Sequence, residues 1–337
     1  MDSSIQLKKL KESRARSFWI VVYFLMMAGI IAGLYYSTLK IEYIWGWNRI
    51  PGYFLSNDLV EIKSEMKGDV SEIRAKGKES VIVVKDGDTT ESYTVPTKGI
   101  TVATGDFVYA GDPLAAYKEW RVGILILGLW ITLKVSVIAI FIGVIIGLFA
   151  GLARVSSNPA LKWSAITYIE LIRGSPLLVQ IFIWHYALGT MITGLLDKMG
   201  YTGEISPLVF GIAALAFFTG AYVAEMVRAG IQSIHRGQTE ASRSLGMTYL
   251  QSMLHVILPQ AMRRILPPLA GQFISLIKDS SLLGIIAIRE LTKATREGVT
   301  ASLQVFELWF VCAILYLLLT FALSMLVQYL ERRAATQ

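Results

Sequence analysis

The clearest chemical pattern in this sequence lies in a polar segment, residues 230–268, between two apolar runs. A short helix is expected around Glu240, ending at Gly246, and a second helix is expected after Thr248. Glycine tolerates the left-handed conformation that ends many helices, and a threonine side chain caps the start of the next. Pro259 is then expected to bend the chain back toward the apolar run. The pattern predicts a helix–turn–helix hairpin, a shape suited to docking in a groove on a partner.

Catalytic and metal-binding chemistry has no comparable pattern. The histidines have no metal-ligand spacing, and no set of His, Asp, Ser or Cys has catalytic spacing. The motif G-x-x-x-x-G-K-[ST] is absent from the sequence, so this chain is not expected to cradle nucleotide phosphate. We therefore expect no enzyme activity, no metal and no cofactor in the chain itself. The scattered histidines are His185, His235 and His255.

Composition assigns the chain to the integral membrane proteins. Its 337 residues are 54% hydrophobic and 17% charged, whereas soluble domains average about 25% charged residues. The formal net charge of +7 is attributed to Lys and Arg beside membrane spans, so no nucleic-acid partner is expected. The single cysteine, Cys312, excludes an intrachain disulfide.

Six apolar segments are long enough to cross a membrane, which takes about 20 residues. The first is expected to be an uncleaved anchor rather than a signal peptide, because it is longer than a signal core and no A-x-A site follows it closely. The segments are residues 18–36, a span within 122–153, 176–196, 207–227, 265–288 and 306–330.

The distribution of Lys and Arg predicts the orientation, because cytoplasmic loops carry an excess of both. The basic N-terminus, the C-terminus and the segments 154–173 and 228–264 are expected in the cytoplasm. The loop 289–302 is then expected outside, although it carries three cations that argue against this placement. They are Arg289, Lys293 and Arg296.

Residues 37–120 differ in composition from the apolar segments and are expected to form an extracytoplasmic insert that is partly β. Residues 58–78 are mixed in charge and tolerate a helix, whereas 81–84 and 93–95 favour strands with an Asp-Gly turn between them. Residues 99–114 resemble half of a small barrel-sandwich (lipoyl-like) domain, with no lysine clearly at the modified hairpin position. The insert is interpreted as a structural module on the membrane part, and a functional role is the alternative.

The hairpin segment resembles the EAA motif of ABC importer permeases. That pattern is Glu-Ala-Ala, three residues, Gly, nine residues, Ile, one residue and Leu-Pro. Ser242 replaces the second alanine and Val256 replaces the isoleucine. The resemblance implies that this loop is the coupling helix, which docks on an ATP-hydrolysing subunit through the acidic contact and turns at the glycine. The matching residues are Glu240, Ala241, Ser242, Gly246, Val256, Leu258 and Pro259.

Three flanking stretches are similar to the polar amino-acid branch of these permeases. Residues 168–180 resemble YIELFRGTPLLVQ, residues 221–231 resemble AY-x-AE-x-x-R-x-GI, and residues 272–282 resemble QFISLLKDTSL. The resemblance covers about 127–331. It implies an all-α membrane protein with a type I ABC importer permease bundle, in which five core spans follow one N-terminal anchor span and a small extracytoplasmic β-rich insert.

Ionisable residues near membrane depth are candidates for function, because their burial in lipid is costly. Two pairs at i, i+3 spacing, Glu170 with Arg173 and Glu225 with Arg228, are interpreted as structural braces, with substrate contact as the alternative. A zwitterionic substrate needs both a cation and an anion, although snorkelling and inter-helix pairing also account for these charges. The candidate pathway residues are Lys134, Gln272, Ser275, Lys278 and Asp279, with Thr132 a weaker candidate.

The resemblance implies a transmembrane permease subunit of an ATP-driven amino-acid importer in the plasma (inner) membrane. Its implied partners are two ATPase subunits that bind ATP and Mg, a second permease (itself or a homologous chain), an extracytoplasmic substrate-binding protein and membrane lipid. The competing hypotheses are a membrane-anchored adaptor or signalling protein with a β module, and a membrane enzyme. The expected parts are a cytoplasmic tail 1–17, an anchor 18–36, the insert 37–120, the permease domain 121–331 with coupling loop 230–262, and a cytoplasmic tail 332–337.

Overall fold

A computed structural model describes the backbone of residues 2–201, 203 and 205–335, and the side chains of residues 18–329 except 58, 202 and 204. The side chains of the expected tail 1–17, and residues 336–337 of the other tail, lie outside the described residues. The chain divides into two compact units, Met1–Trp47 and Asn48–Gln337, which are described separately.

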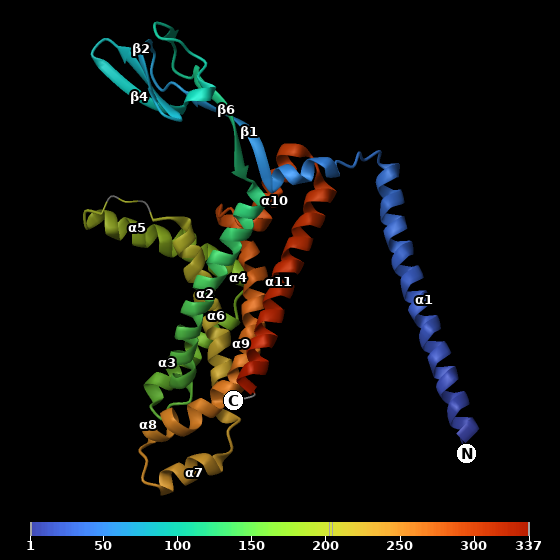
Figure 1. Cartoon of the computed structure of the whole chain (residues 1–337). Helices are drawn as coiled ribbons and strands as arrows, with labels where there is room; N and C mark the ends of the chain where they lie inside the picture. The colour runs from blue at the N-terminus through green and yellow to red at the C-terminus, as the bar shows by residue number, and fades with distance from the viewer. Residues whose placement is uncertain (1, 202, 204, 336–337) are drawn as a thin grey trace. The chain divides into compact units, whose positions relative to one another are not determined.

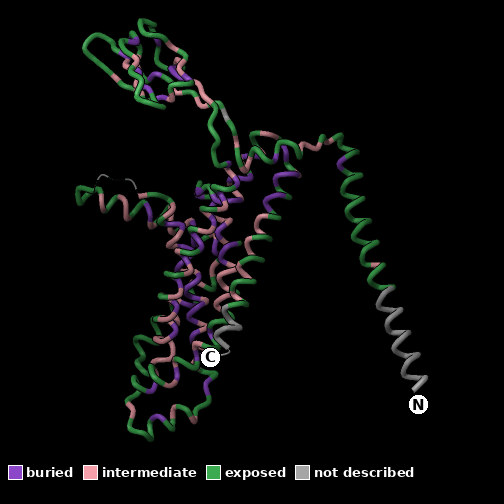
Figure 2. Tube along the Cα trace, in the orientation of Figure 1, coloured by how far each residue is buried: buried purple, intermediate pink, exposed green. Residues whose placement is uncertain are grey.

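The first unit is one long helix, α1 (Asp2–Lys40), followed by a short connection. Its apolar segment Phe18–Lys40 is long enough to span a membrane and extends past the expected end at residue 36. None of the residues in its apolar window is buried within the chain, and Figure 2 shows this part of the helix exposed. The helix therefore presents an apolar surface on all sides, as a helix in contact with lipid does.

The second unit begins with a 3₁₀ turn, η1 (Trp47–Tyr53), and a β region (Figure 1). Its elements are β1 (Leu55–Lys63), β2 (Gly68–Lys76), β3 (Glu79–Asp86), β4 (Thr89–Pro96), η2 (Thr97–Gly99), β5 (Phe107–Val108) and β6 (Pro113–Val122). β1 and β6 form a two-stranded antiparallel ribbon, and the four other strands form a sheet in the order β4-β3-β2-β5.

The turn between β3 and β4 lies where the sequence predicts it, with Asp86 paired to Thr89 and Gly87 at φ +59°. The helical tendency expected for residues 58–78 is wrong, because these residues lie mainly in β1 and β2. β1 pairs with β6, a strand distant in sequence, so its conformation is set by a tertiary partner rather than by local propensity. The sheet encloses a small apolar core that includes Val70, Ile82 and Val84.

The rest of the second unit is helical. Its elements are α2 (Ile124–Arg154), α3 (Pro159–Arg173), α4 (Leu177–Phe182), a π-turn η3 (Ile183–Leu188), α5 (Gly189–Lys198), α6 (Pro207–Gln232), α7 (Arg236–Ser244), α8 (Tyr249–Ser252), a π-turn η4 (Met253–Ile257), α9 (Leu258–Asp279), a 3₁₀ turn η5 (Ser280–Ile286), α10 (Leu291–Ser302) and α11 (Val305–Ala335). Among the described residues, six helical segments are long and apolar enough to cross a membrane, and they overlap the six expected spans.

Two further differences from expectation lie in the C-terminal half of the helical region. The fifth apolar helix begins at Tyr249 rather than near residue 265, because α8, η4 and α9 run on without a break. The segment expected as the loop 289–302 is mostly the helix α10. Its first turn is capped by Glu290, whose carboxylate accepts hydrogen bonds from the N–H groups of Thr292 and Lys293 and from the Tyr316 hydroxyl. Burial raises the pKa of the Glu290 carboxyl above its ordinary value.

The α2–α6 contact is the most extensive helix–helix contact in the described chain. Gly143, Gly147 and Gly151 recur every four residues along one face of α2, and Thr219, Val223 and Val227 recur at the same interval on α6. A Cβ atom at Gly147 would lie 2.5 Å from Cβ of Val223. Such spacing of small residues lets two membrane helices approach until their backbones nearly touch.

We therefore expect Gly147→Ala to destabilise the protein by about 1–3 kcal/mol, the usual cost of overpacking a filled contact. Gly194→Ala in α5 is the matched control, because no other atom lies within 4 Å of a Cβ built there. The control is expected to be neutral or slightly stabilising, since alanine favours helix more than glycine does. Thermal unfolding of the purified variants measures the difference, and equal melting temperatures would contradict the close α2–α6 packing.

Candidate coupling hairpin and ion-pair cluster

The segment singled out by its sequence pattern folds into a hairpin of α7 and α8. The His235 side chain caps the start of α7 by accepting the N–H of Gly237. The helix ends at Ser244 with Leu245 as its C-cap, and Gly246 follows with φ +80°, a left-handed conformation that disfavours side chains. Thr248 then opens α8 with a reciprocal capping box shared with Gln251. The expected glycine turn and threonine cap are thus both present.

Helical hydrogen bonding continues through Pro259, so the chain makes no break there, and the bend expected at this residue stays a prediction. The π-turn η4 immediately precedes α9, and the N–H of Leu258 donates to the carbonyl of Met253, five residues earlier. Proline cannot donate a backbone hydrogen bond, but at the first turn of a helix that donor is not needed. Starting a new hydrogen-bond register just before Pro259 therefore accommodates the proline without a break.

Ser242 has a structural role that the sequence comparison did not predict. Its side chain is buried and its hydroxyl hydrogen-bonds to the Ser252 hydroxyl and to the carbonyl of Thr239. The contact joins the two arms of the hairpin, because Ser242 lies on α7 and Ser252 ends α8. Ser242 stands where the family pattern has alanine, and its hydroxyl provides a polar bridge that alanine cannot form.

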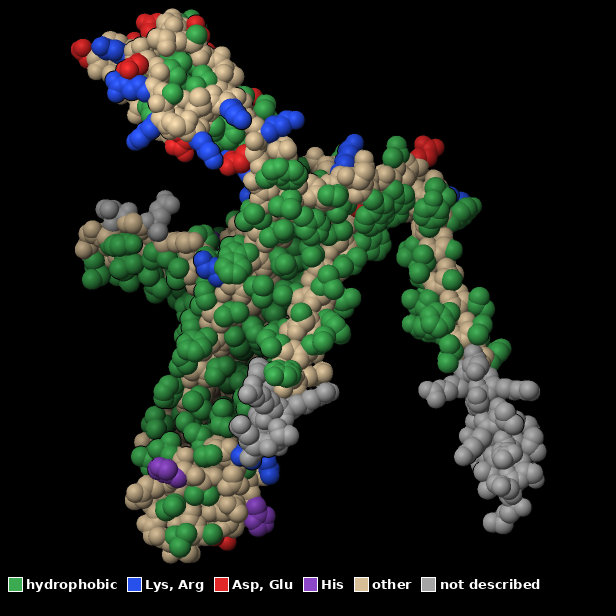
Figure 3. All heavy atoms as spheres, in the orientation of Figure 1, with side chains coloured by type: hydrophobic (Ala, Val, Ile, Leu, Met, Phe, Trp, Pro, Cys, Tyr) green, Lys and Arg blue, Asp and Glu red, His purple; other side chains and the backbone are tan. Residues whose placement is uncertain are grey.

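The outer surface of the hairpin is exposed, polar along α7 and apolar at its tip. Leu245 is 81% exposed at the turn and Leu250 is 64% exposed on α8, and Glu240 and Ala241 are also exposed on α7. Figure 3 shows hydrophobic side chains on this end of the molecule. The inner side is anchored, since Ile234, Ile257 and other residues share a buried cluster with α6 and α9. The hairpin thus combines a fixed base with an exposed apolar tip.

Helices α2, α3 and α6 are joined by an ion-pair cluster centred on Glu225. Three guanidinium groups surround its carboxylate: Arg154 Nε at 3.0 Å, Arg228 Nη2 at 2.9 Å and Arg173 Nη1 at 3.8 Å. Glu170, whose side chain is 65% exposed, lies 3.6 Å from Arg154 Nη1. One carboxylate with 16% exposure is therefore shared by three cations.

Only one of the two expected local pairs forms. Glu225 and Arg228 pair at i, i+3 as predicted. Glu170 and Arg173 do not pair with each other, since each finds a partner on a neighbouring helix, Arg154 and Glu225 respectively. Arg154 was not among the sequence candidates. The sequence did contain a signal for Arg154: it ends one apolar run, and two other apolar runs also end near charged residues.

The candidate pathway residues are not brought together by any described contact. Lys134 and Lys278 are exposed on the surface of the described chain, and no hydrogen bond or ion pair between described residues joins either to Asp279. Gln272, Ser275 and Asp279 are partly buried and share a face of α9 through i, i+3 and i+7 spacing. Thr132 is buried and accepts the N–H of Leu291, which is a structural role.

Within the described part of the chain, no group of three or more His, Cys, Asp or Glu side chains could hold a metal ion. The geometry offers a helical hairpin with an exposed tip and an ion-pair cluster joining α2, α3 and α6.

Comparison with known proteins identifies the family. Residues 143–336 match the model of the binding-protein-dependent transport system inner membrane component. The chain therefore belongs to this family of ABC importer permeases.

Individual relatives agree with this family. The chain is similar to the "Probable glutamine ABC transporter permease protein GlnM" of Bacillus subtilis (strain 168), at 39% identity over 61% of this chain and 91% of the relative. It is also similar to the "L-cystine transport system permease protein TcyB" of the same organism, at 36% identity over 61% of this chain and 84% of the relative. A solved structure, "Crystal structure of an amino acid ABC transporter with histidines", matches with a TM-score of 0.55 at 40% identity, over 62% of this chain and 94% of that one.

The Ser242–Ser252 bridge leads to a test of how the hairpin is held. Ser242→Ala is expected to cost about 1–3 kcal/mol of local stability, because it leaves the Ser252 hydroxyl buried without its partner. Hydrogen exchange of the α7 amides in the full chain measures the loss. Ser244→Ala on the same helix is the control, since that side chain is exposed. The double variant with Ser252→Ala should cost less than the sum of the single variants, and strict additivity would argue against the bridge.

The Glu225 cluster makes a second test. Glu225→Gln is expected to destabilise the protein by about 3 kcal/mol, because three arginines lose their shared counter-charge in a poorly solvated place. Glu170→Gln is the matched control and is expected to cost less than about 1 kcal/mol, as exposed ion pairs do. Thermal unfolding in the same detergent compares the two, and a larger effect at Glu170 would overturn the central position of Glu225.

Proposed function

We propose that this chain is the transmembrane permease subunit of an ATP-driven amino-acid importer and that the α7–α8 hairpin couples it to ATPase subunits. The observation that carries the proposal is the hairpin itself. The motif residues Glu240 and Ala241 are exposed on an anchored element with an apolar tip, in a chain that belongs to the importer permeases. An element with a buried base and an exposed apolar tip can transmit force between a partner and the bundle.

The partners follow from what one chain supplies. A permease that carries one set of core spans pairs with itself or with a homologous permease to enclose a pathway. Two ATPase subunits bind ATP and Mg and close on each other, and their closure moves the two hairpins. An extracytoplasmic binding protein delivers the substrate, and the two permeases exchange between inward-open and outward-open packings.

The substrate class is a polar amino acid. The name of one relative refers to glutamine and that of another to L-cystine, which supports the class rather than one compound. Gln272, Ser275 and Asp279 share one face of α9 and are the pathway residues best placed to act together. Lys134 and Lys278 supply cations on the surface of the single chain, where a second permease or lipid would contact them.

The proposed orientation places the hairpin and both termini in the cytoplasm. It places α10 and the β region on the extracytoplasmic side. The cations of α10 were the feature that fitted this orientation least. Arg289 Nε lies 2.6 Å from Glu297, Lys293 Nζ lies 3.9 Å from it, and Arg296 donates to the carbonyl of Gly284. These contacts give the cations a structural role in α10, which supports their presence outside.

The alternative of a membrane-anchored adaptor accounts for fewer of these observations than the importer does. A membrane-anchored adaptor with a β module needs neither a family match over residues 143–336 nor a hairpin with the importer loop pattern. The importer accounts for both features with one mechanism.

Co-purification tests the coupling role. Tagged wild-type chain, extracted gently from its native membrane, is expected to carry a nucleotide-binding ATPase. Glu240→Lys reverses an exposed charge on the docking surface and is expected to reduce the retained ATPase about ten-fold or more, as charge reversal at an interface can cost several kcal/mol. Gly246→Pro is expected to have the same effect by a different route, because proline cannot adopt the φ of +80° found there.

The matched control is Asp197→Lys, an exposed carboxylate near the end of α5 and outside the hairpin. It should leave the amount of ATPase unchanged. Retention of the ATPase by both hairpin variants, or its absence from wild type under conditions that preserve membrane complexes, would refute the coupling role.

A further inference from the structure

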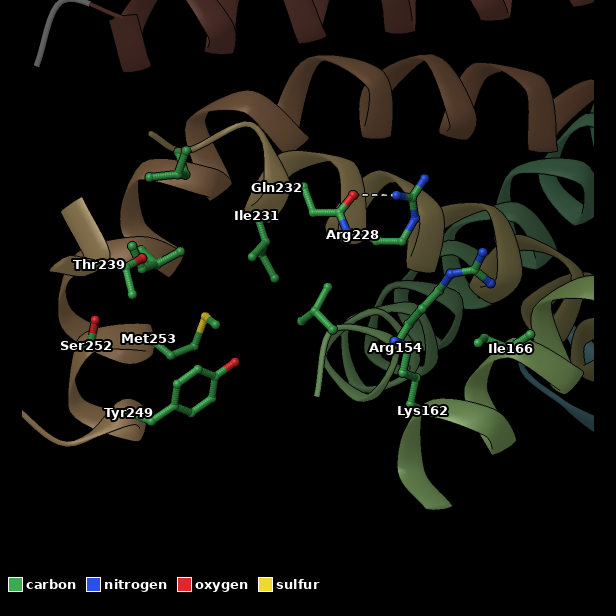
Figure 4. Close-up of a pocket in the computed structure, with 13 residues that line it drawn as sticks. Arg154, Lys162, Ile166, Arg228, Ile231, Gln232, Thr239, Tyr249, Ser252 and Met253 are labelled. Atoms are coloured by element: carbon green, nitrogen blue, oxygen red, sulfur yellow. Dashed lines mark hydrogen bonds between the residues drawn. The ribbon is translucent and has the colours of Figure 1, made fainter. Parts of the chain in front are cut away.

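A pocket of about 530 Å³ lies between the end of the helical bundle and the α7–α8 hairpin. Its walls come from the ends of α2 and α6, the first half of α3, and the helices that form the hairpin. Figure 4 shows Arg154, Lys162 and Ile166 on one side and Tyr249, Ser252 and Met253 on the other. The size is typical of a pocket for a small organic group, which is about 300–1,000 Å³. No role has yet been given to it.

The lining is cationic and carries no carboxylate. Arg154, Lys162 and Arg228 contribute positive charge, and Gln232, Thr239 and Ser252 contribute hydrogen-bonding groups. Lys162 is exposed and forms no ion pair with any described residue. The Tyr249 hydroxyl points into the gap in Figure 4. Such a surface favours an anion that has several hydrogen-bond acceptors.

The positive charge is in excess even when neighbouring groups are counted. Four cations, Arg154, Lys162, Arg173 and Arg228, lie at this junction with two carboxylates, Glu170 and Glu225. The C-terminal ends of α2 and α6 add about half a negative charge each. An excess of about one positive charge therefore remains beside a partly enclosed pocket.

The pocket lies at the end of the helical bundle where several candidate membrane spans have an end. Three candidate spans have an end in its lining: one ends at Arg154, one at Gln232, and one begins at Tyr249. Trp163 is 66% exposed next to Lys162, and tryptophan is enriched where hydrocarbon meets headgroups. Apolar side chains of Ile166, Ile231 and Met253 line the pocket beside its cations.

We propose that this pocket binds the phosphate headgroup of an anionic phospholipid. Cationic residues would hold the phosphate, hydroxyl and amide groups would bind the polar headgroup, and apolar side chains would contact the adjoining glycerol and acyl region. Basic pockets between membrane helices are known sites for acidic headgroups. A free inorganic phosphate shares the charge but would fill only part of the volume and would not use the apolar wall. The inference does not depend on the coupling role of the hairpin.

Native mass spectrometry of the full-length chain in detergent tests the site. The protein is titrated with phosphatidylglycerol and, separately, with phosphatidylcholine that has the same acyl chains. Wild type is expected to retain phosphatidylglycerol in preference to phosphatidylcholine. Lys162→Glu changes the local charge by two units and is expected to weaken phosphatidylglycerol binding about ten-fold or more, and Lys162→Gln about five-fold.

Lys198→Glu is the matched control, because Lys198 is an exposed lysine at the end of another span and outside the pocket. It should bind phosphatidylglycerol as wild type does. Equal weakening by Lys162→Glu and Lys198→Glu would overturn the site, as would equal binding of the two lipids by wild type. In the last part of the experiment, an excess of inorganic phosphate competes with the bound lipid. If phosphate displaces the bound lipid completely, the lipid assignment is overturned in favour of a free-anion site.

Discussion

The close approach of α2 and α6 is the constraint on which the rest of the helical unit depends. With glycine at residues 143, 147 and 151, the side chains of α6 can lie against the backbone of α2. Lipid offers no hydrophobic driving force between helices, so close packing and interhelical polar contacts must provide the association. The same register brings the ends of both helices together, which places Arg154 of α2 beside Glu225 of α6. Packing in the apolar region therefore determines the geometry of the charged junction.

The base of the hairpin is held by contacts with α6 and α9. Gly230 faces Ile265, with a Cβ built there only 2.5 Å from Ile265 Cγ1, so α6 and α9 are held together directly below the hairpin. Arg264 on α9 donates to the carbonyl of Ser233, just past the end of α6, and Gln260 donates to Gln238 on α7. The hairpin is thus joined to two helices of the bundle at its base while its tip remains free. An element built this way moves with the bundle as a unit.

The sequence predicted the features that arise from local rules. Span positions follow from apolar length, Gly246 from its left-handed turn, and the Thr248 cap from helix-start chemistry. The features that it missed are set by tertiary partners. Glu170 and Arg173 satisfy the local i, i+3 rule, yet each pairs across helices, because three helix ends converge there. The glycine spacing of α2 was readable as a helix-packing signal, whereas the pairing of β1 with β6 required knowledge of which distant strand lies beside it.

The continuity of helical hydrogen bonding at Pro259 bears on how the proposed coupling would reach the candidate pathway residues. One helical segment runs from Tyr249 to Ile286 and includes the face that carries Gln272, Ser275 and Asp279. Pro267 and Pro268 lie within it and remove two backbone donors, so this helix can bend there as well as at the π-turn η4. Under the proposed coupling, a displacement of α8 would reach α9 through helical backbone, and the two prolines are where its direction can change before it reaches the candidate pathway residues.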